Sequence, residues 1–267
     1  MNCQSTSLYI TYYNEPDINR KKELETAIKE NINNHFFSKV YIFNESGDLS
    51  FISSNKVSEL PVLHRPVYQD FFNLILSHTD ENEIHIIANS DIFFDDNIEI
   101  LKFINFSNSC FALSRWDIQP DGSAKLFNRN DSQDVWIFKG KIKEGVFGDF
   151  PVGVPFCDNR IMFELQKAGY KVLNPSFSIK AYHLHAGKRE EYKKENLSIY
   201  VDPPYRYHYP HNLYSLPRTL WFNLTHKEKL GRYRYDPKKI NRWWPVRLFR
   251  KLYESATGNR MRLIGYR

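Results

Sequence analysis

The stretch Ile84-His85-Ile86-Ile87-Ala88-Asn89-Ser90-Asp91-Ile92-Phe93-Phe94 decides the fold. Its first five residues are almost continuously apolar, which is typical of a strand covered on both faces of a parallel sheet. The strand ends abruptly in the polar triplet Asn89-Ser90-Asp91. Open α/β sheets bind ligands at the carboxyl ends of parallel strands, and we expect Asp91 to lie at such an end. A carboxylate there can hold Mg²⁺ or Mn²⁺, although the triplet can also simply end the strand and cap the next element.

On either side of this stretch, apolar strand patterns alternate with helical ones. Strands are expected at residues 8–13, 39–43, 83–88, 110–115, 134–138 and 171–173. Helices are expected at residues 20–33, 68–77 and from 157 or 158 to 168. The alternation predicts a Rossmann-like α/β domain with a mostly parallel central sheet flanked by helices. We assign this domain to residues 1–200, and residues 201–267 to a Pro/Tyr-rich extension with a basic helical tail.

A Gly- and Pro-rich loop precedes the last of these helices. The loop covers residues 147–155, and Asp158 follows it in the expected first helical turn, where the helix dipole favours a carboxylate. If the loop lies over a sugar, Asp158 is placed to accept a proton from an acceptor hydroxyl. The alternative is that Asp158 caps the helix.

Two alternate histidines are followed by basic residues near the end of the domain. His183 and His185 offer imidazoles that can complete a metal shell, and Lys188 and Arg189 can neutralise a diphosphate. A His-x-His pair can instead be structural or solvated.

The order of these three motifs resembles that of GT-A glycosyltransferases, over about residues 8–195. Residues 65–72, 112–117 and 132–138 also look like a bacterial and viral surface-polysaccharide branch of that fold. The resemblance implies that Asp91 is the metal-bound acid, Asp158 the base, and His183 or His185 the remaining metal ligand. Asn89 stands where the family motif has its first Asp, which implies weaker or water-mediated metal binding.

The resemblance also implies contacts with the donor and the acceptor. The implied donor-binding residues are Thr11, Tyr12, Tyr13, Asn14, Glu15, Asn89, Ser90, Lys188 and Arg189, with Arg65 and Asp70 as weaker candidates. The implied sugar- or acceptor-binding residues are Arg115, Asp117, Trp136, Gly153 and Asn159. Two alternatives stay open: Arg115 and Asp117 can form a buried ion pair, and Trp136 can be a core aromatic.

The interpretation that joins these features is an inverting, metal-dependent sugar transfer. The donor is expected to be a nucleoside-diphosphate sugar, first of all a UDP-sugar, and the acceptor a hydroxyl of a surface glycan or lipid-linked glycan. A retaining enzyme in which Asp158 only positions the acceptor remains open. A sugar-nucleotide pyrophosphorylase is an alternative, but residues 11–15 lack the glycine-rich loop that it needs. Two further alternatives lack catalysis. One is a polyanion- or nucleic-acid-binding protein, and the other is a catalytically inactive sugar-binding homologue.

The positive charge of the chain is concentrated at its carboxyl end. The net charge is +6, and residues 237–267 hold nine Lys/Arg against Glu254, so they carry +8 and the rest −2. Residues 243–253 predict an amphipathic helix with Pro245 near its start. We expect this tail to bind an anionic membrane surface rather than nucleic acid; packing against the catalytic domain is the alternative. Because no signal sequence or membrane-spanning stretch is seen, the expected location is cytoplasmic, peripheral at the inner face of the membrane.

Overall fold

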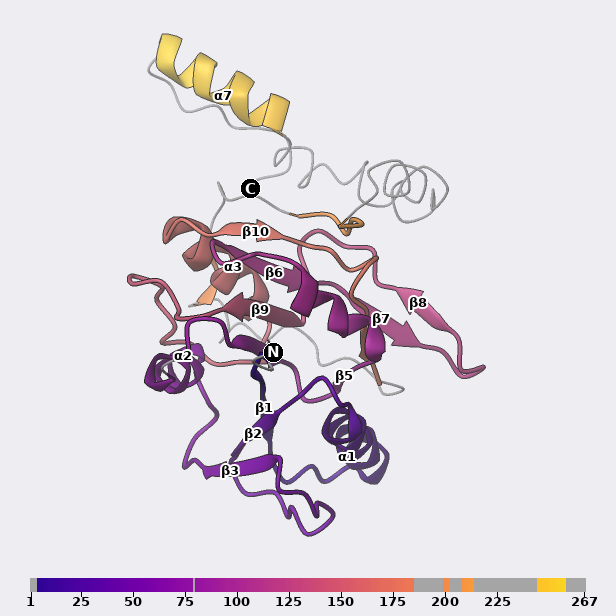
Figure 1. Cartoon of the computed structure of the whole chain (residues 1–267). Coiled ribbons are helices and arrows are strands. Elements are labelled where there is room, and N and C mark those ends of the chain that lie inside the picture. Colours follow the sequence, from indigo (N-terminus) through magenta and orange to yellow (C-terminus); the bar gives the residue numbers. More distant parts are fainter. Residues whose placement is uncertain (1–3, 79, 185–198, 202–207, 214–243, 258–267) are drawn as a thin grey trace. The chain divides into compact units, whose positions relative to one another are not determined.

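The computed structural model describes residues 4–78, 80–184, 199–201, 208–213 and 244–257 (Figure 1). These residues divide between two compact units. The first unit contains the strands of both sheets and the helices that cover them, and the second contains the helix α7 (Trp244–Thr257).

The first unit is built on a seven-stranded sheet in the order β10-β6-β9-β4-β1-β2-β3. Its strands are β1 (Thr6–Tyr12), β2 (Lys39–Asn44), β3 (Val57–Pro61), β4 (Ile84–Ala88), β6 (Ser109–Leu113), β9 (Val135–Lys139) and β10 (Lys171–Leu173). Parallel pairs join β10 to β6 and join β4, β1, β2 and β3 in turn, whereas β9 pairs antiparallel with both of its neighbours. The sheet is therefore mostly parallel, as predicted.

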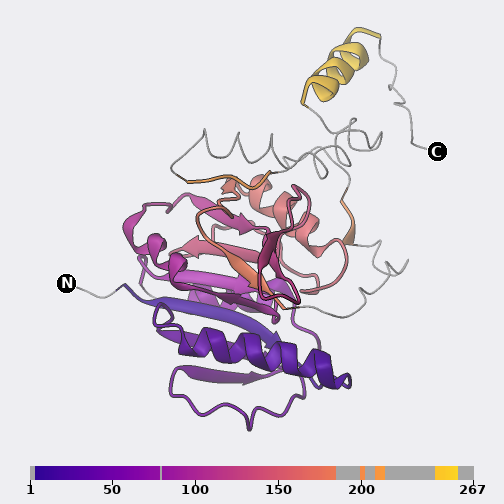
Figure 2. The ribbon, with the colours of Figure 1, turned by 90° about the vertical axis from the view of Figure 1, so that its right-hand side faces the viewer.

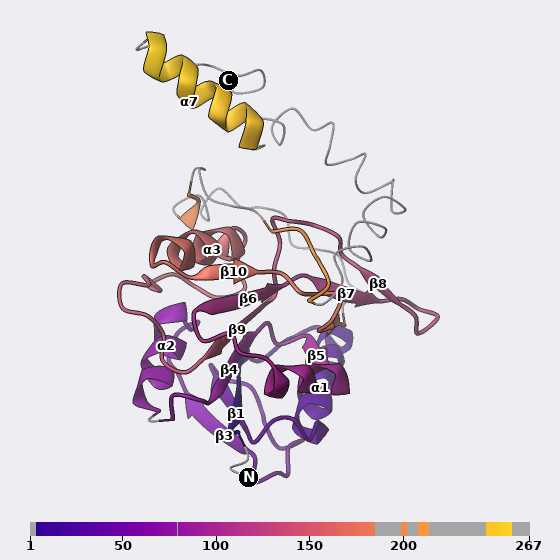
Figure 3. The same cartoon turned by 45° about the horizontal axis from the view of Figure 1, so that its top comes forward.

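Helices cover both faces of this sheet, because successive residues of each strand point to opposite sides. Leu8 and Ile10 of β1 pack with Leu24 and Ile28 of α1 (Ile18–Asn33). The opposite face packs against α2 (Tyr68–Ser77) and α3 (Cys157–Lys167). Figures 1 and 3 show α1 on one side of the strands and α2 on the other, and in Figure 2 α1 lies in front of them.

A second, four-stranded sheet stands next to the carboxyl end of β4. Its order is β5-β11-β7-β8, with the strands β5 (Ile92–Phe94), β11 (Ala181–His183), β7 (Arg115–Ile118) and β8 (Ala124–Leu126). A short 3₁₀ helix, η1 (Asp96–Phe103), follows β5. The expected strand at residues 110–115 is thus two strands, because β6 ends at Leu113 and Arg115 begins β7 in the other sheet. This sheet brings His183 beside Asp117 and the start of β5.

The helix α7 corresponds to the segment for which a helix was expected, and Pro245 is its second residue. Three of its apolar side chains are exposed: Leu248 at 48%, Phe249 at 59% and Leu252 at 61%. Among the described residues, no helix combines the length and apolar character required to span a bilayer.

Candidate functional site

Asp91 lies between β4 and β5 at the carboxyl edge of the central sheet, as the sequence predicts. Asp91 is 8% exposed. Two basic side chains contact the same carboxylate oxygen, Oδ2. The Arg20 guanidinium donates a hydrogen bond to it, and Nε2 of His183 lies 3.2 Å away. Burial by itself raises the pKa of Asp91, but the charges and hydrogen bonds of His183 and Arg20 outweigh it and hold that pKa well below its usual range. Asp91 is therefore an ionised, buried carboxylate.

Arg20 is a site residue that the sequence analysis missed. It stands in the first turn of α1, where Asp17 caps the helix by accepting hydrogen bonds from the backbone N–H groups of Asn19 and Arg20. Its guanidinium also donates to the Leu184 carbonyl at 3.0 Å. A helix that follows a parallel strand begins at the carboxyl edge of the sheet, so the βα order contained a signal for this position.

His183 connects Asp91 to a second ion pair, formed by buried Arg115 and half-buried Asp117. Its Nδ1 lies 2.9 Å from Oδ1 of Asp117, which also accepts a 2.8 Å hydrogen bond from Nε of Arg115. Burial lowers the pKa of His183, but Asp91 and Asp117 together raise it to about 9. The Arg115 guanidinium further donates to both oxygens of Asp134, at 3.2 and 3.1 Å. Arg115 and Asp117 thus form the ion pair that stood as the alternative to sugar contacts.

The polar residues next to Asp91 hold neighbouring strands together. The Asn89 amide donates to Oδ1 of Asp134 at 3.0 Å, which joins the end of β4 to the start of β9. The hydroxyls of Ser90 and Thr11 lie 2.8 Å apart, which joins the ends of β4 and β1. These contacts fix the edge on which Asp91 stands.

Asp158 is in the first turn of α3, as expected, but it does not cap the helix. The N-cap residue is Phe156, whose φ of 74° is in the left-handed region that a bulky side chain rarely adopts. Oδ1 of Asp158 accepts a 2.8 Å hydrogen bond from the Asn159 backbone N–H. Burial and, after it, the negative charge of Asp134 raise the pKa of Asp158 to about 7 despite this bond. Asp134 therefore links Asp158 electrostatically to the group around Arg115.

The glycine-rich loop lies alongside the start of α2. The Val152 N–H donates to the Pro66 carbonyl at 3.0 Å, and Val67 and Pro151 form an isolated β-bridge. Gly153 is exposed with a φ of 71°, and a Cβ added to it would lie 4.0 Å from the Arg65 guanidinium. Arg65 and Gly153 are therefore neighbours.

Four other residues expected to bind the donor are Asp70, Tyr13, Asn14 and Glu15. The Asp70 carboxylate accepts a 2.9 Å hydrogen bond from the Val67 N–H, which caps α2. The Tyr13 hydroxyl donates to Glu15 at 2.9 Å, and Asn14 is exposed beside them.

Two aromatic assignments need correction. Tyr12 is 0% exposed and Trp136 2% exposed, because both rings belong to the apolar core on either side of the central sheet. Covered rings do not provide a surface for a nucleotide or a sugar, so Trp136 is the core aromatic of the alternative interpretation. His185, Lys188 and Arg189 lie outside the described residues.

The expected divalent cation fits between Asp91 and His183. Neighbouring ligands of an octahedral ion with bonds of about 2.1 Å lie roughly 3 Å apart. Nε2 of His183 and Oδ2 of Asp91 are separated by 3.2 Å, close to that value. Binding there requires neutral His183 and displacement of Arg20, because the imidazole and the guanidinium both contact Oδ2 of Asp91.

Comparisons with known proteins give only distant structural likenesses. No protein-family model matches the sequence, and no curated protein sequence matches it either. Among solved structures, 68% of the chain aligns with 57% of a mannosyltransferase from Pyrobaculum calidifontis in complex with GDP-Man and Mn²⁺, at 12% identity and a TM-score of 0.46. GalNAc-T7 with UDP, GalNAc and Mn²⁺ aligns at 11% identity and a TM-score of 0.45, over 94% of this chain and 54% of that one.

A nucleotidyltransferase structure resembles this chain to about the same degree. A 2-C-methyl-D-erythritol 4-phosphate cytidylyltransferase from Francisella tularensis aligns at 11% identity and a TM-score of 0.43, over 64% of this chain and 90% of that one. The chain spans little more than half the length of the two glycosyltransferases. At these identities and TM-scores the likenesses do not assign an activity to this chain.

Proposed function

We propose that this protein is a metal-dependent glycosyltransferase that moves a sugar from a nucleoside-diphosphate donor to a hydroxyl of a glycan. The observation that supports it is the convergence of Asp91, His183 and Arg20 at the carboxyl edge of the sheet. This group combines an ionised carboxylate and an imidazole, which suit a divalent cation, with a guanidinium, which suits a phosphate.

Asp91 and His183 are proposed to hold Mn²⁺ or Mg²⁺, with the donor diphosphate supplying further oxygen ligands. When bound, the cation neutralises charge on the departing diphosphate. Arg20 then turns from Asp91 to a phosphate oxygen, so that it keeps an anionic partner throughout. Asp117 accepts from Nδ1 of His183 and thereby directs Nε2 of the ring toward Asp91.

Asp158 is proposed as the general base of an inverting transfer. The acceptor oxygen forms a bond to the anomeric carbon while the bond from that carbon to the diphosphate breaks, and the diphosphate leaves with the electron pair. The hydroxyl proton passes to the Asp158 carboxylate. A base with a pKa of about 7 is suited to this task near neutral pH, since it is substantially ionised and still basic.

The donor nucleotide is proposed to lie at the ends of β1 and β4. Thr11 and Ser90 stand there, and Tyr13 and Glu15 follow β1. Arg65, beside the glycine-rich loop, and Arg20 both carry a positive charge close enough to Tyr13 to oppose the rise in its pKa. UDP-sugars are the first donors to test.

Ligand binding tests the proposal directly. UDP-, GDP- and dTDP-sugars are added with and without Mn²⁺, and the unfolding midpoint and calorimetric affinity are measured. A donor at 100 times its Kd is expected to stabilise the fold by about 2.7 kcal/mol. Asp91→Asn is expected to lose the Mn²⁺-dependent part of the donor affinity and of the stabilisation. Asp121→Asn serves as the control, because Asp121 is exposed in the turn between β7 and β8. If no nucleotide sugar binds, or if its affinity is the same without Mn²⁺ and in Asp91→Asn, the site is misassigned.

A sugar-nucleotide pyrophosphorylase has the same kind of fold and is distinguished by its products. It forms a nucleoside triphosphate when the sugar nucleotide is mixed with pyrophosphate, whereas a glycosyltransferase releases a nucleoside diphosphate. Product analysis with and without pyrophosphate separates the two.

For residues 237–267 we propose reversible binding to an anionic membrane surface, which would bring the enzyme to a lipid-linked acceptor. The support is the charge of +8 together with the exposed Leu248, Phe249 and Leu252 on α7. Each Lys or Arg near such a surface contributes about 1 kcal/mol, so several together with apolar anchors give substantial binding.

A further inference from the structure

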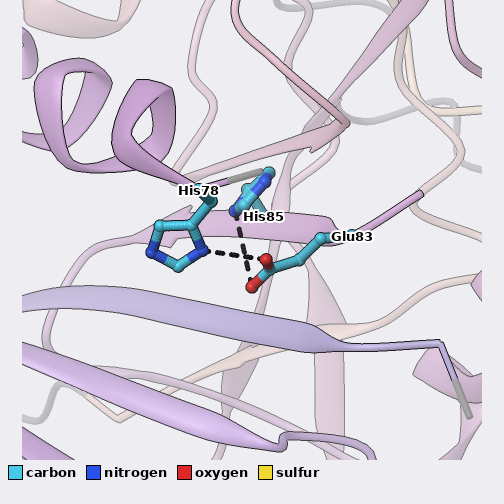
Figure 4. Close-up of side chains that lie close together, drawn as sticks. All are labelled: His78, Glu83 and His85. Carbon is cyan, nitrogen blue, oxygen red and sulfur yellow. Dashed lines mark hydrogen bonds and ion pairs between the residues drawn. The ribbon is translucent and has the colours of Figure 1, made fainter. Parts of the chain in front are cut away.

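Three potential metal ligands converge at the amino end of β4, the end opposite to Asp91. His78 is the C-cap residue of α2, Glu83 directly precedes β4, and His85 is its second residue. One ligand atom of each side chain lies within 4.8 Å of those of the other two. Figure 4 shows both imidazoles turned toward the carboxylate. Nδ1 of His78 lies 2.8 Å from Oε2 of Glu83, and Nδ1 of His85 lies 4.0 Å from Oε1.

The electrostatic setting of Glu83 favours a cation at this position. Glu83 is 5% exposed and His85 is 1% exposed. Among the described residues, the ion-pair partners of Glu83 are these two imidazoles and include neither Lys nor Arg. Ser7 donates a further hydrogen bond to the carboxylate. A buried carboxylate is costly unless its charge is compensated, and a cation bound at this position would compensate it.

Aromatic rings limit access of water to this cluster. Tyr9 and Tyr41 stack with their centroids 5.1 Å apart, and Tyr41 packs edge-on against His78 at 5.6 Å. The Tyr9 hydroxyl lies 2.9 Å from Nδ1 of His85. His85 points to the face of the sheet covered by α2, because Ile84 and Ile86 on either side of it pack on the other face. His85 therefore lies on the same face of the sheet as α2, whose C-cap residue is His78.

From this geometry we propose that His78, Glu83 and His85 form a Zn²⁺ site distinct from the Asp91 centre. Two imidazoles and a carboxylate are ligands that zinc accepts in tetrahedral sites, with bonds of about 2.0–2.2 Å. Such bonds place ligand atoms roughly 3.3 Å apart, so the 2.8 and 4.0 Å separations need adjustments of less than about 1 Å. Water or the Tyr9 hydroxyl would complete the shell, and the present hydrogen bond between Tyr9 and His85 would be exchanged for a metal bond.

The bound ion would tie the end of α2 to the start of β4 and so hold the connection between them. It would neutralise Glu83 and stabilise the folded chain, because the three ligands converge only when α2 is packed on the sheet. This role does not depend on the proposed sugar transfer.

Zinc titration of the metal-free, full-length protein tests the proposal. Calorimetry with Zn²⁺ and visible spectra with Co²⁺ as a substitute are recorded for the wild type, His78→Gln and Glu83→Gln. Circular dichroism in the absence of metal establishes that each variant is folded. His78 is the preferred position because its side chain is 15% exposed and its replacement disturbs the core less than that of His85.

Two matched variants separate this site from other metal binding. His35→Gln changes an exposed histidine elsewhere, and Asp91→Asn removes the proposed catalytic centre. We expect one Zn²⁺ to bind the wild type and both control variants with equal affinity, and to bind His78→Gln and Glu83→Gln at least roughly tenfold more weakly. Zn²⁺ should also raise the unfolding midpoint of the wild type but not of His78→Gln. Unchanged affinity in both ligand variants, no binding by the wild type, or loss of binding in Asp91→Asn alone would overturn the proposal.

Discussion

Replacing Asp158 with Asn is expected to make the protein less active and more stable at the same time. Asn keeps the shape of the side chain and a carbonyl oxygen for the Asn159 N–H, but it cannot take a proton or become charged. As a general base, Asp158 is expected to contribute about 10²–10⁴-fold to turnover. A residue with a purely structural role would instead lower stability when replaced.

The gain in stability follows from the pKa of Asp158, which burial and then Asp134 raise from 3.8 to about 7. The unfolded chain loses this proton above about pH 4, whereas the folded chain keeps it until about pH 7, so ionisation favours unfolding as the pH rises between these values. One pKa unit corresponds to about 1.4 kcal/mol, so the folded wild type is destabilised by roughly 4 kcal/mol above pH 7. Asp158→Asn avoids this destabilisation, because the Asn side chain does not ionise.

Urea unfolding of both proteins at pH 5, 6, 7 and 8 measures the difference. The free energy of unfolding of Asp158→Asn should exceed that of the wild type by about 2 kcal/mol at pH 5 and by roughly 4 kcal/mol at pH 8. Asp121→Asn is the matched control, because hydrogen bonds from Ser123 lower the pKa of the exposed Asp121 and the variant should gain nothing as the pH rises. A difference that does not grow with pH, or a variant less stable than the wild type at pH 8, would refute the reasoning.

Three further changes test other parts of the structure. Asp91→Asn should remove Mn²⁺-dependent nucleotide binding by calorimetry, and it should leave Arg20 without its buried carboxylate, seen as a lower unfolding midpoint. Arg115→Gln should lower the free energy of unfolding by about 3–5 kcal/mol in urea titrations, because Asp117 and Asp134 lose a buried cation; a change below about 1 kcal/mol would contradict the buried pair. Deleting residues 237–267 should abolish sedimentation with anionic vesicles and preserve turnover, whereas an unfolded fragment would show that the tail belongs to the core.

The sequence predicted the strands and helices well where the apolar pattern was long. The helix at residues 68–77 has the expected bounds, and the mostly parallel sheet follows from the alternation of the two patterns. Strand direction was not accessible, because an apolar run such as that of β9 has the same composition in either orientation. The change of sheet between Leu113 and Arg115 was missed because Ser114 alone separates β6 from β7, and no Gly or Pro marks the break.

The positions of candidate site residues in the fold were predicted where a single element determines them. Asp91 at a strand end and Asp158 in a first helical turn are such cases. The βα order indicates the edge at which Arg20 stands, but its contact with Asp91 joins elements far apart in sequence. The pairing of His183 with Asp117 does so too, and a single sequence has no local signal for such contacts. Tyr12 and Trp136 illustrate the opposite error, because aromatic residues next to a polar motif serve the core as readily as a ligand.

Product analysis of a sugar-nucleotide reaction tests the proposed activity most directly. The purified chain is incubated with Mn²⁺, a UDP-, GDP- or dTDP-sugar and a glycan acceptor, and the nucleotide and sugar products are identified beside those of Asp91→Asn and Asp158→Asn. The proposal predicts a nucleoside diphosphate and a glycoside of inverted anomeric configuration, both formed by the wild type and reduced at least about a hundredfold in Asp158→Asn. A nucleoside triphosphate formed on adding pyrophosphate, or product formation at the wild-type rate by both variants, would contradict it.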